Sequence, residues 1–266
     1  MGRALGLMCG AGVLPARMAA QARRRGWRVV AFAFGDAPGL DAHADRTVTS
    51  RLADLAPVLA TLAEERVAAA LFSGKFWLGD VLRVRAGDHV GRAIAASAGS
   101  LAERPLAETV VSTLAALGIE VLDQRAFLGD WIEGAGCWTT RKPTDAEWDD
   151  VRRGLALARR CADLGVGQTV VLRQGVVAAV EALEGTTEAV RRGAALAGRG
   201  AVVAKAVARD NDYRFDTPTI GPDTVRAAAE GGVATIGVEA GRVLLLERES
   251  MVEAADRSGI SLVGVD

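Results

Sequence analysis

Apolar residues in the first half of the chain alternate between short continuous runs and stretches with helical spacing. Short apolar runs predict buried strands at 4–9, 27–34, 67–73 and 119–122. Apolar positions that recur every three or four residues predict helices at 15–25, from Leu55 or Ala56 to about 66, and at 105–118. Strands that alternate with helices form parallel sheets with crossover helices. Residues 1–138 are therefore predicted to form a Rossmann-like N-terminal domain.

The pattern changes at residues 127–145, which follow neither period and contain several glycines, two tryptophans and a proline. We place the domain boundary there, between residues 138 and 139. The pattern of the second half predicts a long helix ended by Gly165 and a hairpin at 169–182. It also predicts a strand at 200–208 and a pair of strands within 233–249 that turn at Ala240-Gly241. Two short helices are predicted near 222–230 and 250–258. Residues 139–266 are thus predicted to form a distinct α+β C-terminal domain.

Composition narrows the class of protein. The chain has 266 residues, half of them apolar and 24% charged, with a net charge of -1. This balance is typical of a soluble globular protein and offers no general attraction for nucleic acid. Three scattered cysteines favour a reducing compartment, and no apolar stretch is long enough to cross a membrane. We expect a cytoplasmic protein.

Two glycine-containing turns follow predicted strands and are candidate phosphate sites. The first is Gly10-Ala11-Gly12, whose backbone N–H groups we expect to be free at a helix N-terminus. Pro15 occupies the place of the third glycine of a dinucleotide fingerprint, so a structural turn and NAD binding, helped by Asp36, are alternatives. The second is Gly74-Lys75, where ligands of parallel sheets bind. A solvated lysine is the alternative there.

Two further stretches lie in the second half. Glu184, Gly185 and Thr186 follow the predicted hairpin, and Thr186 or Thr187 suits a helix N-cap without any function. Asp210, Asp212 and Asp216 lie within seven residues of one another, beside Arg209 and Arg214. Carboxylates without Cys or His suit Mg²⁺, and arginines grip phosphate oxygens in bidentate fashion. A charged, solvated loop is the alternative.

The chain resembles the LpxI-type UDP-2,3-diacylglucosamine diphosphatases of lipid A biosynthesis, nearly end to end. The resemblance lies in GLMCGAGVLP at the start, SGK at 73–75, GVGQTVVLRQGVVAAVEALEGT at 165–186, RFDTPTIGPDTV at 214–225 and the C-terminal GVEAGRVLLLERESMVEAADRSGISLVGVD. It implies hydrolysis of the pyrophosphate of UDP-2,3-diacylglucosamine to UMP and 2,3-diacylglucosamine 1-phosphate, with Mg²⁺ and with the substrate held between two domains. A diacylated substrate implies peripheral contact with the inner membrane; homo-oligomerisation is left open.

The resemblance also implies site residues. The essential aspartate of the family matches Asp216, which either holds the metal or orients the water, and we assign Thr186 a catalytic role beside it. Asp212 is a second candidate metal ligand. The predicted substrate and phosphate contacts are Gly10, Ala11, Gly12, Gly74, Lys75, Gln168, Glu184, Lys205 and Arg214.

The chain departs from the family at three places. Relatives usually carry Asp at the position of Thr187, a Lys-Pro pair where this chain has AVARDND around Ala208-Arg209, and an acidic GDD near Gly99-Ser100-Leu101. These differences leave Asp216 in place. They motivate two alternatives: a nucleotide- or lipid-binding regulator without turnover, and a pyrophosphatase of another nucleotide-sugar.

Overall fold

The computed structural model describes residues 2–76, 87–100 and 103–266, and the chain divides into two compact units. The first unit comprises Met1–Leu128 and Asp212–Asp216, and the second comprises Gly129–Asn211 and Thr217–Asp266. The predicted boundary between two domains, at residues 138 and 139, stays a prediction.

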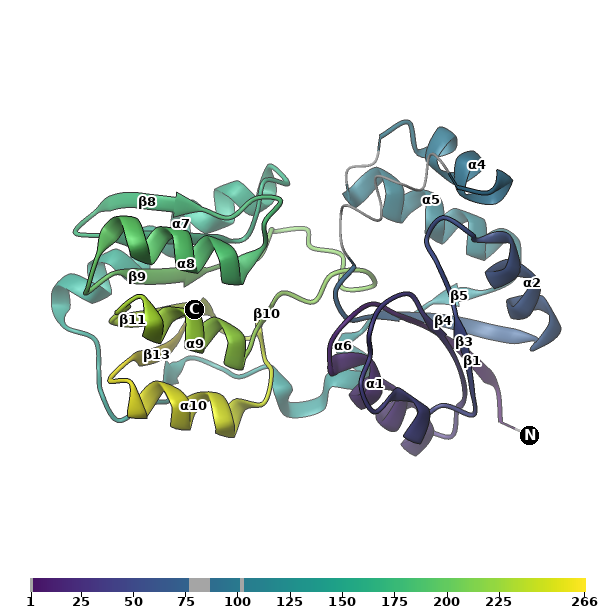
Figure 1. The fold of residues 1–266 in the computed structure, drawn as a ribbon, viewed down its shortest axis with the longest axis horizontal. Coiled ribbons are helices and arrows are strands. Elements are labelled where there is room, and N and C mark those ends of the chain that lie inside the picture. Colours follow the sequence, from purple (N-terminus) through teal and green to yellow (C-terminus); the bar gives the residue numbers. More distant parts are fainter. Residues whose placement is uncertain (1, 77–86, 101–102) are drawn as a thin grey trace. The chain divides into compact units, whose positions relative to one another are not determined.

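Within the described residues, the first unit contains a five-stranded parallel sheet in the order β3-β2-β1-β4-β5. Its strands are β1 (Ala4–Cys9), β2 (Arg28–Ala33), β3 (Arg46–Thr49), β4 (Val67–Ser73) and β5 (Glu120–Val121). Its helices are α1 (Leu14–Arg24), the 3₁₀ turn η1 (Leu40–Ala42), α2 (Ala56–Glu64), α4 (His89–Ala98), α5 (Glu103–Ala116) and α6 (Arg125–Leu128). In Figure 1, α1 and α6 cover one face of this sheet, and α2, α4 and α5 lie on the other.

The continuous apolar runs produce this arrangement because a parallel sheet is covered by helices on both faces. All six residues of β1 are buried, and β1 lies in the middle of the sheet. The core includes Phe32 of β2, Leu62 of α2 and Ile119, which directly precedes β5. The predicted Rossmann-like parallel sheet is confirmed. The prediction missed β3, whose residues are mostly exposed, and α4, which lies in a stretch with poor apolar periodicity, as well as the short helices η1 and α6.

The second unit contains a separate mixed sheet of six strands, in the order β6-β13-β11-β9-β7-β8, within the described residues. These strands are β6 (Gly136–Cys137), β7 (Thr169–Arg173), β8 (Val176–Val180), β9 (Val202–Lys205), β11 (Thr235–Glu239) and β13 (Ser261–Val265). The helices are η3 (Gly129–Trp131), α7 (Asp145–Asp163), α8 (Thr186–Ala197), α9 (Pro222–Glu230) and α10 (Arg248–Arg257). The row formed by α8, α9 and α10 covers one face, and α7 covers the other (Figure 1). A distinct C-terminal fold that mixes helices and strands is confirmed.

Small residues bring these helices close to their sheet. A methyl group on Gly154 of α7 would lie 2.6 Å from Cβ of Ala204, and one on Gly193 of α8 would lie 2.5 Å from Cβ of Val171. Neither glycine can therefore become alanine without moving its helix away from the strands. Thr144 and Glu147 form a capping box that begins α7. None of the helices built from described residues is long and apolar enough to cross a membrane.

One predicted element of the second half is wrong. Residues 233–249 do not form a hairpin: after β11 the chain turns, and β12 (Leu244–Leu245) pairs in parallel with β10 (Thr219–Ile220) in a small sheet of its own. The neighbours of β11 are instead β9 and β13, both parallel to it. Apolar periodicity detected the two runs within 233–249. It could not show that β11 pairs with β13 and not with the second run. The predicted hairpin at 169–182 is confirmed by the antiparallel pair β7 and β8.

Candidate functional site

The glycine turn after β1 is joined to the turn after β4 by backbone hydrogen bonds. The N–H of Gly10 donates to the carbonyl oxygen of Ser73 (2.8 Å), and Ala11 and Lys75 exchange two N–H···O bonds of 2.8 Å. The N–H of Gly12 donates to the carbonyl oxygen of Asp36 (2.9 Å). The expectation that these three N–H groups are free for a phosphate is therefore wrong. The same bonds remove them as donors to the pyrophosphate of a dinucleotide.

Glycine is needed in these turns because the two backbones approach closely. A Cβ on Gly10 would lie 2.6 Å from the carbonyl carbon and oxygen of Lys75. Gly74 has a φ of 86°, and a Cβ there would lie 2.8 Å from Cγ of Pro15. The turns fix Lys75, whose side chain is exposed, next to the end of β1. Lys75 thus lies beyond the carboxyl ends of β1 and β4, where the sequence placed it.

We expect Gly10→Ala to lower the free energy of unfolding by about 1–3 kcal/mol, because the obstructing atoms belong to a backbone that cannot rotate away. Urea denaturation followed by circular dichroism measures this change. Gly134→Ala is the matched control, since a Cβ there meets nothing within 4 Å. Equal midpoints for the two variants would contradict the proposed crowding at Gly10.

Residues Asp212–Asp216 follow β9 in sequence but belong to the first unit. The N–H of Gln124 donates to the carbonyl oxygen of Tyr213 (3.0 Å), and the guanidinium of Arg125 lies 4.2 Å from the centre of the Tyr213 ring. Phe215 packs on Phe72 of β4 with 4.8 Å between ring centroids. Since Phe72 directly precedes Ser73 at the end of β4, these contacts bring the segment that carries Asp216 to the edge of the sheet that carries Lys75.

Two predicted ligands in this segment bind each other. Nε of Arg214 donates to Oδ1 of Asp212 (2.9 Å) and Nη2 donates to Oδ2 (2.7 Å), which forms a bidentate ion pair. The hydrogen bonds from the Arg214 guanidinium hold the pKa of Asp212 below its usual range. The pair leaves Nη1 of Arg214 and further lone pairs of Asp212 available, and the predicted roles of Arg214 on phosphate and of Asp212 on a metal stay predictions. No group of three or more metal-ligating side chains occurs among the described residues.

The second unit has a polar cluster of its own around the buried side chain of Lys205, which is 3% exposed at the end of β9. Its ammonium donates to Oγ1 of Thr186 (2.8 Å), and that hydroxyl donates to Oε1 of Glu181 (2.9 Å). The second oxygen of Glu181 lies 3.8 Å from the ammonium and accepts the N–H of Gln168 (3.4 Å). Three predicted residues, Gln168, Thr186 and Lys205, are thus brought together.

Glu181 is the residue that sequence reasoning missed. It directly follows β8, between Val180 and Ala182, inside the stretch 169–182 that was predicted as a hairpin, and no role was predicted for it from the sequence. Burial disfavours its charged form, but the Lys205 ammonium and the surrounding hydrogen bonds outweigh burial and lower its pKa. The predicted contact Glu184 lies outside the cluster and pairs with Arg192 on the surface.

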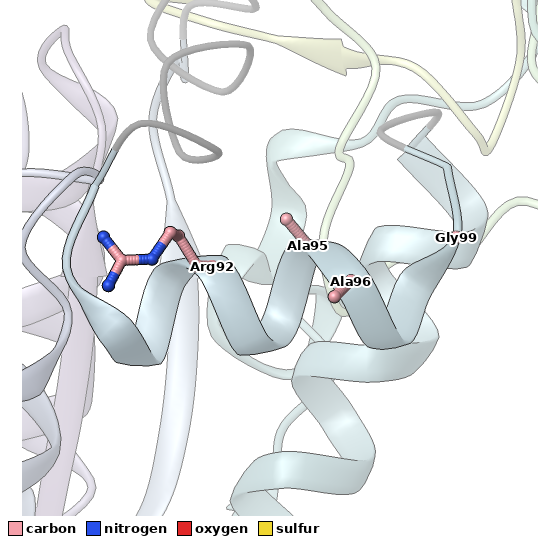
Figure 2. Close-up of a pocket in the computed structure, with 4 residues that line it drawn as sticks. All are labelled: Arg92, Ala95, Ala96 and Gly99. Atoms are coloured by element: carbon pink, nitrogen blue, oxygen red, sulfur yellow. The ribbon is translucent and has the colours of Figure 1, made fainter.

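A cavity of about 410 Å³ lies beside α4, but none of the predicted site residues lines it. Its walls include Arg92, Ala95, Ala96 and Gly99 of the described chain (Figure 2). Figure 2 shows the guanidinium of Arg92 directed away from the two alanines. Gly99 ends α4 in the left-handed conformation, with a φ of 67°, and Leu101 lies outside the described residues.

Comparison with known proteins identifies the family. The LpxI N-terminal domain model matches residues 4–131, and the LpxI C-terminal domain model matches residues 134–263. The chain is 31% identical over 278 residues to the UDP-2,3-diacylglucosamine pyrophosphatase LpxI of Caulobacter vibrioides, covering 99% of this chain and 98% of that protein.

Solved structures add nothing to this assignment. Glycinamide-RNase-transformylase T from Mycobacterium tuberculosis is 17% identical over 67% of this chain and 44% of its own, with a TM-score of 0.26. Phosphoribosylglycinamide synthetase from Anaerococcus prevotii is 12% identical over 66% and 38%, also with a TM-score of 0.26. Such low scores support no argument about fold or function. The two domain models and the end-to-end relative, however, show that the chain belongs to the LpxI family.

Proposed function

We propose that the protein hydrolyses the pyrophosphate bond of UDP-2,3-diacylglucosamine to UMP and 2,3-diacylglucosamine 1-phosphate. The observation that carries this proposal is the end-to-end match to a relative named for that activity, at 31% identity. Both LpxI domain models match as well. In the reaction, water adds to the phosphorus on the sugar side, and the bridging oxygen leaves with UMP.

Each unit carries groups suited to the proposed chemistry: Asp216 in the first unit and the Lys205 cluster in the second. Asp216 orients the attacking water or holds a cation. Lys205 and Thr186 offer a positive charge and a hydroxyl to phosphate oxygens, where preorganised donors stabilise the charge that develops during attack. Glu181 keeps Lys205 compensated in its buried position before substrate arrives. Lys75 is a second, exposed cation for the pyrophosphate.

The residues present fit Mg²⁺ in one mode only. Mg²⁺ often binds through one or two carboxylates together with substrate phosphates and water. Asp216 fits this mode, and Asp212, which pairs with Arg214, would be the second carboxylate. When bound, the cation would neutralise charge on the pyrophosphate oxygens. We further propose that the protein works in the cytoplasm and meets its diacylated substrate at the inner membrane surface.

Incubation with UDP-2,3-diacylglucosamine and Mg²⁺ tests the proposal. We expect equimolar release of UMP and the lipid monophosphate, loss of release on chelation with EDTA, and recovery when Mg²⁺ is restored. UMP no higher than in the Asp216→Asn variant would contradict the proposed function. Binding by calorimetry without hydrolysis would favour the regulator, and turnover of an unacylated nucleotide-sugar alone would favour a pyrophosphatase of another substrate.

A further inference from the structure

Glu239, the last residue of β11, binds the loop through which the chain leaves β9. Its carboxylate is buried, at 5% exposure for the residue, and accepts the N–H of Val207 (2.9 Å). The same carboxylate pairs with Arg159 of α7 (2.7 Å) and with Arg242 (2.9 Å). A single buried acid thus links the loop to a helix and to a neighbouring turn of the second unit.

Arg242 binds the opposite polar groups of the same loop. Its guanidinium donates to the carbonyl oxygens of Ala208 (2.5 Å) and Val207 (3.4 Å). On the next residue, the N–H of Arg209 donates to Oδ1 of Asp163 (2.9 Å). We call Glu239, Arg242 and the backbone of 207–209 the exit clamp. It fixes N–H and carbonyl groups together, so the direction of the backbone is specified as well as its position.

The charges of the exit clamp are not needed for packing alone. Glu239 is buried, but Arg159 and Arg242 are partly exposed, and ion pairs are by themselves weak evidence for stability. Its hydrogen bonds, by contrast, allow few backbone geometries. Only Asp210 and Asn211 separate the clamp from Asp212–Asp216, the segment that carries the proposed catalytic aspartate. Within this segment, Tyr213 is bound by Gln124 and Phe215 packs on Phe72.

We infer that Glu239 and Arg242 are positioning residues, which set the entry of the segment 212–216 and through it the placement of the Asp216 carboxylate. This inference rests on the proposed function for its kinetic consequence.

Three variants test the inference, with Glu147→Gln as the matched control. Glu147 also pairs with an arginine, Arg141 (2.6 Å), but caps α7 instead of the exit loop. We expect Glu239→Gln and Arg242→Ala to lower kcat by about 10- to 100-fold with little change in KM, because misplacement of a reacting group by about 1 Å has an effect of this size. Arg242→Lys keeps the charge without the fork and should fall between Arg242→Ala and the wild type.

Hydrogen exchange supplies a readout that does not depend on activity. We expect the amides of 207–216 to exchange about tenfold faster in Glu239→Gln, as expected for a lost charge-assisted hydrogen bond, and to be unchanged in Glu147→Gln. A kcat equal to that of the control variant at equal stability, or unchanged exchange, would overturn the inference. If the wild type releases no UMP, the proposed function fails and hydrogen exchange alone decides whether the clamp orders the segment.

Discussion

Asp216→Asn should lower the rate of UMP release by about 10²–10⁴-fold, the range by which a positioned acid or base accelerates proton transfer. The substitution keeps the shape of the side chain and removes its charge. The contacts of Tyr213 and Phe215 that dock the segment on the first unit are made by residues that the substitution leaves unchanged. Steady-state kinetics with the natural substrate, beside a thermal unfolding curve, measures both effects.

The control for this experiment is Asp223→Asn. Asp223 is an exposed acid at the start of α9 that pairs with Arg226 on the surface. It should retain the wild-type rate, because exposed ion pairs contribute little. A rate for Asp216→Asn within a few-fold of this control would remove Asp216 from the mechanism. Should the residual rate of Asp216→Asn rise with Mg²⁺ concentration, the role of the carboxylate is to hold the cation; should it stay level, its role is to orient water.

Lys205→Met should destabilise the protein by about 3–5 kcal/mol, since removal of one partner leaves the other buried charge uncompensated. The stranded charge is that of Glu181, which is 9% exposed. The double variant Lys205→Met, Glu181→Gln should recover most of this loss because no charge is left inside. Urea denaturation of the two single variants and the double variant gives the coupling between the residues.

The pH dependence of the same variants provides an independent check. In the wild type the pKa of Glu181 is lowered, so the stability that it contributes is present above the unfolded value of about 4.3 and is lost as pH falls through the folded pKa. In Lys205→Met the ammonium no longer opposes burial, so the folded pKa of Glu181 should rise and the destabilisation should shrink as pH falls from 8 to 5. A loss of stability that does not vary with pH would contradict a stranded carboxylate.

The double variant also separates stability from the proposed chemistry. If Lys205 binds a phosphate of the substrate, the double variant should be nearly as stable as the wild type and yet hydrolyse the substrate slowly. Full activity in the double variant would limit Lys205 to a structural role.

The candidate site was only partly predictable from sequence, because the hydrogen-bond partners of its residues lie far away along the chain. Gln168 and Thr186 lie in a motif that carries the family resemblance, Lys205 was predicted as a phosphate partner, and the structure brings the three together. Glu181, their common partner, has no local signal. The pairing of Arg214 with Asp212 is equally hidden, because spacing shows that two charges can meet but not whether they bind each other or a ligand.

The sequence by itself determined the family and most strands of the parallel sheet. Continuous apolar runs predicted the parallel strands β1, β2 and β4, because strands covered on both faces by helices can carry no polar side. The motifs along the chain were sufficient to indicate an LpxI-type protein. Tertiary structure decided which polar groups remain available for chemistry. The N–H groups of the glycine turn are used by Ser73, Lys75 and Asp36, and the loop before Asp216 is bound by Glu239. Such bonds join residues far apart along the chain, and apolar periodicity carries no information about them.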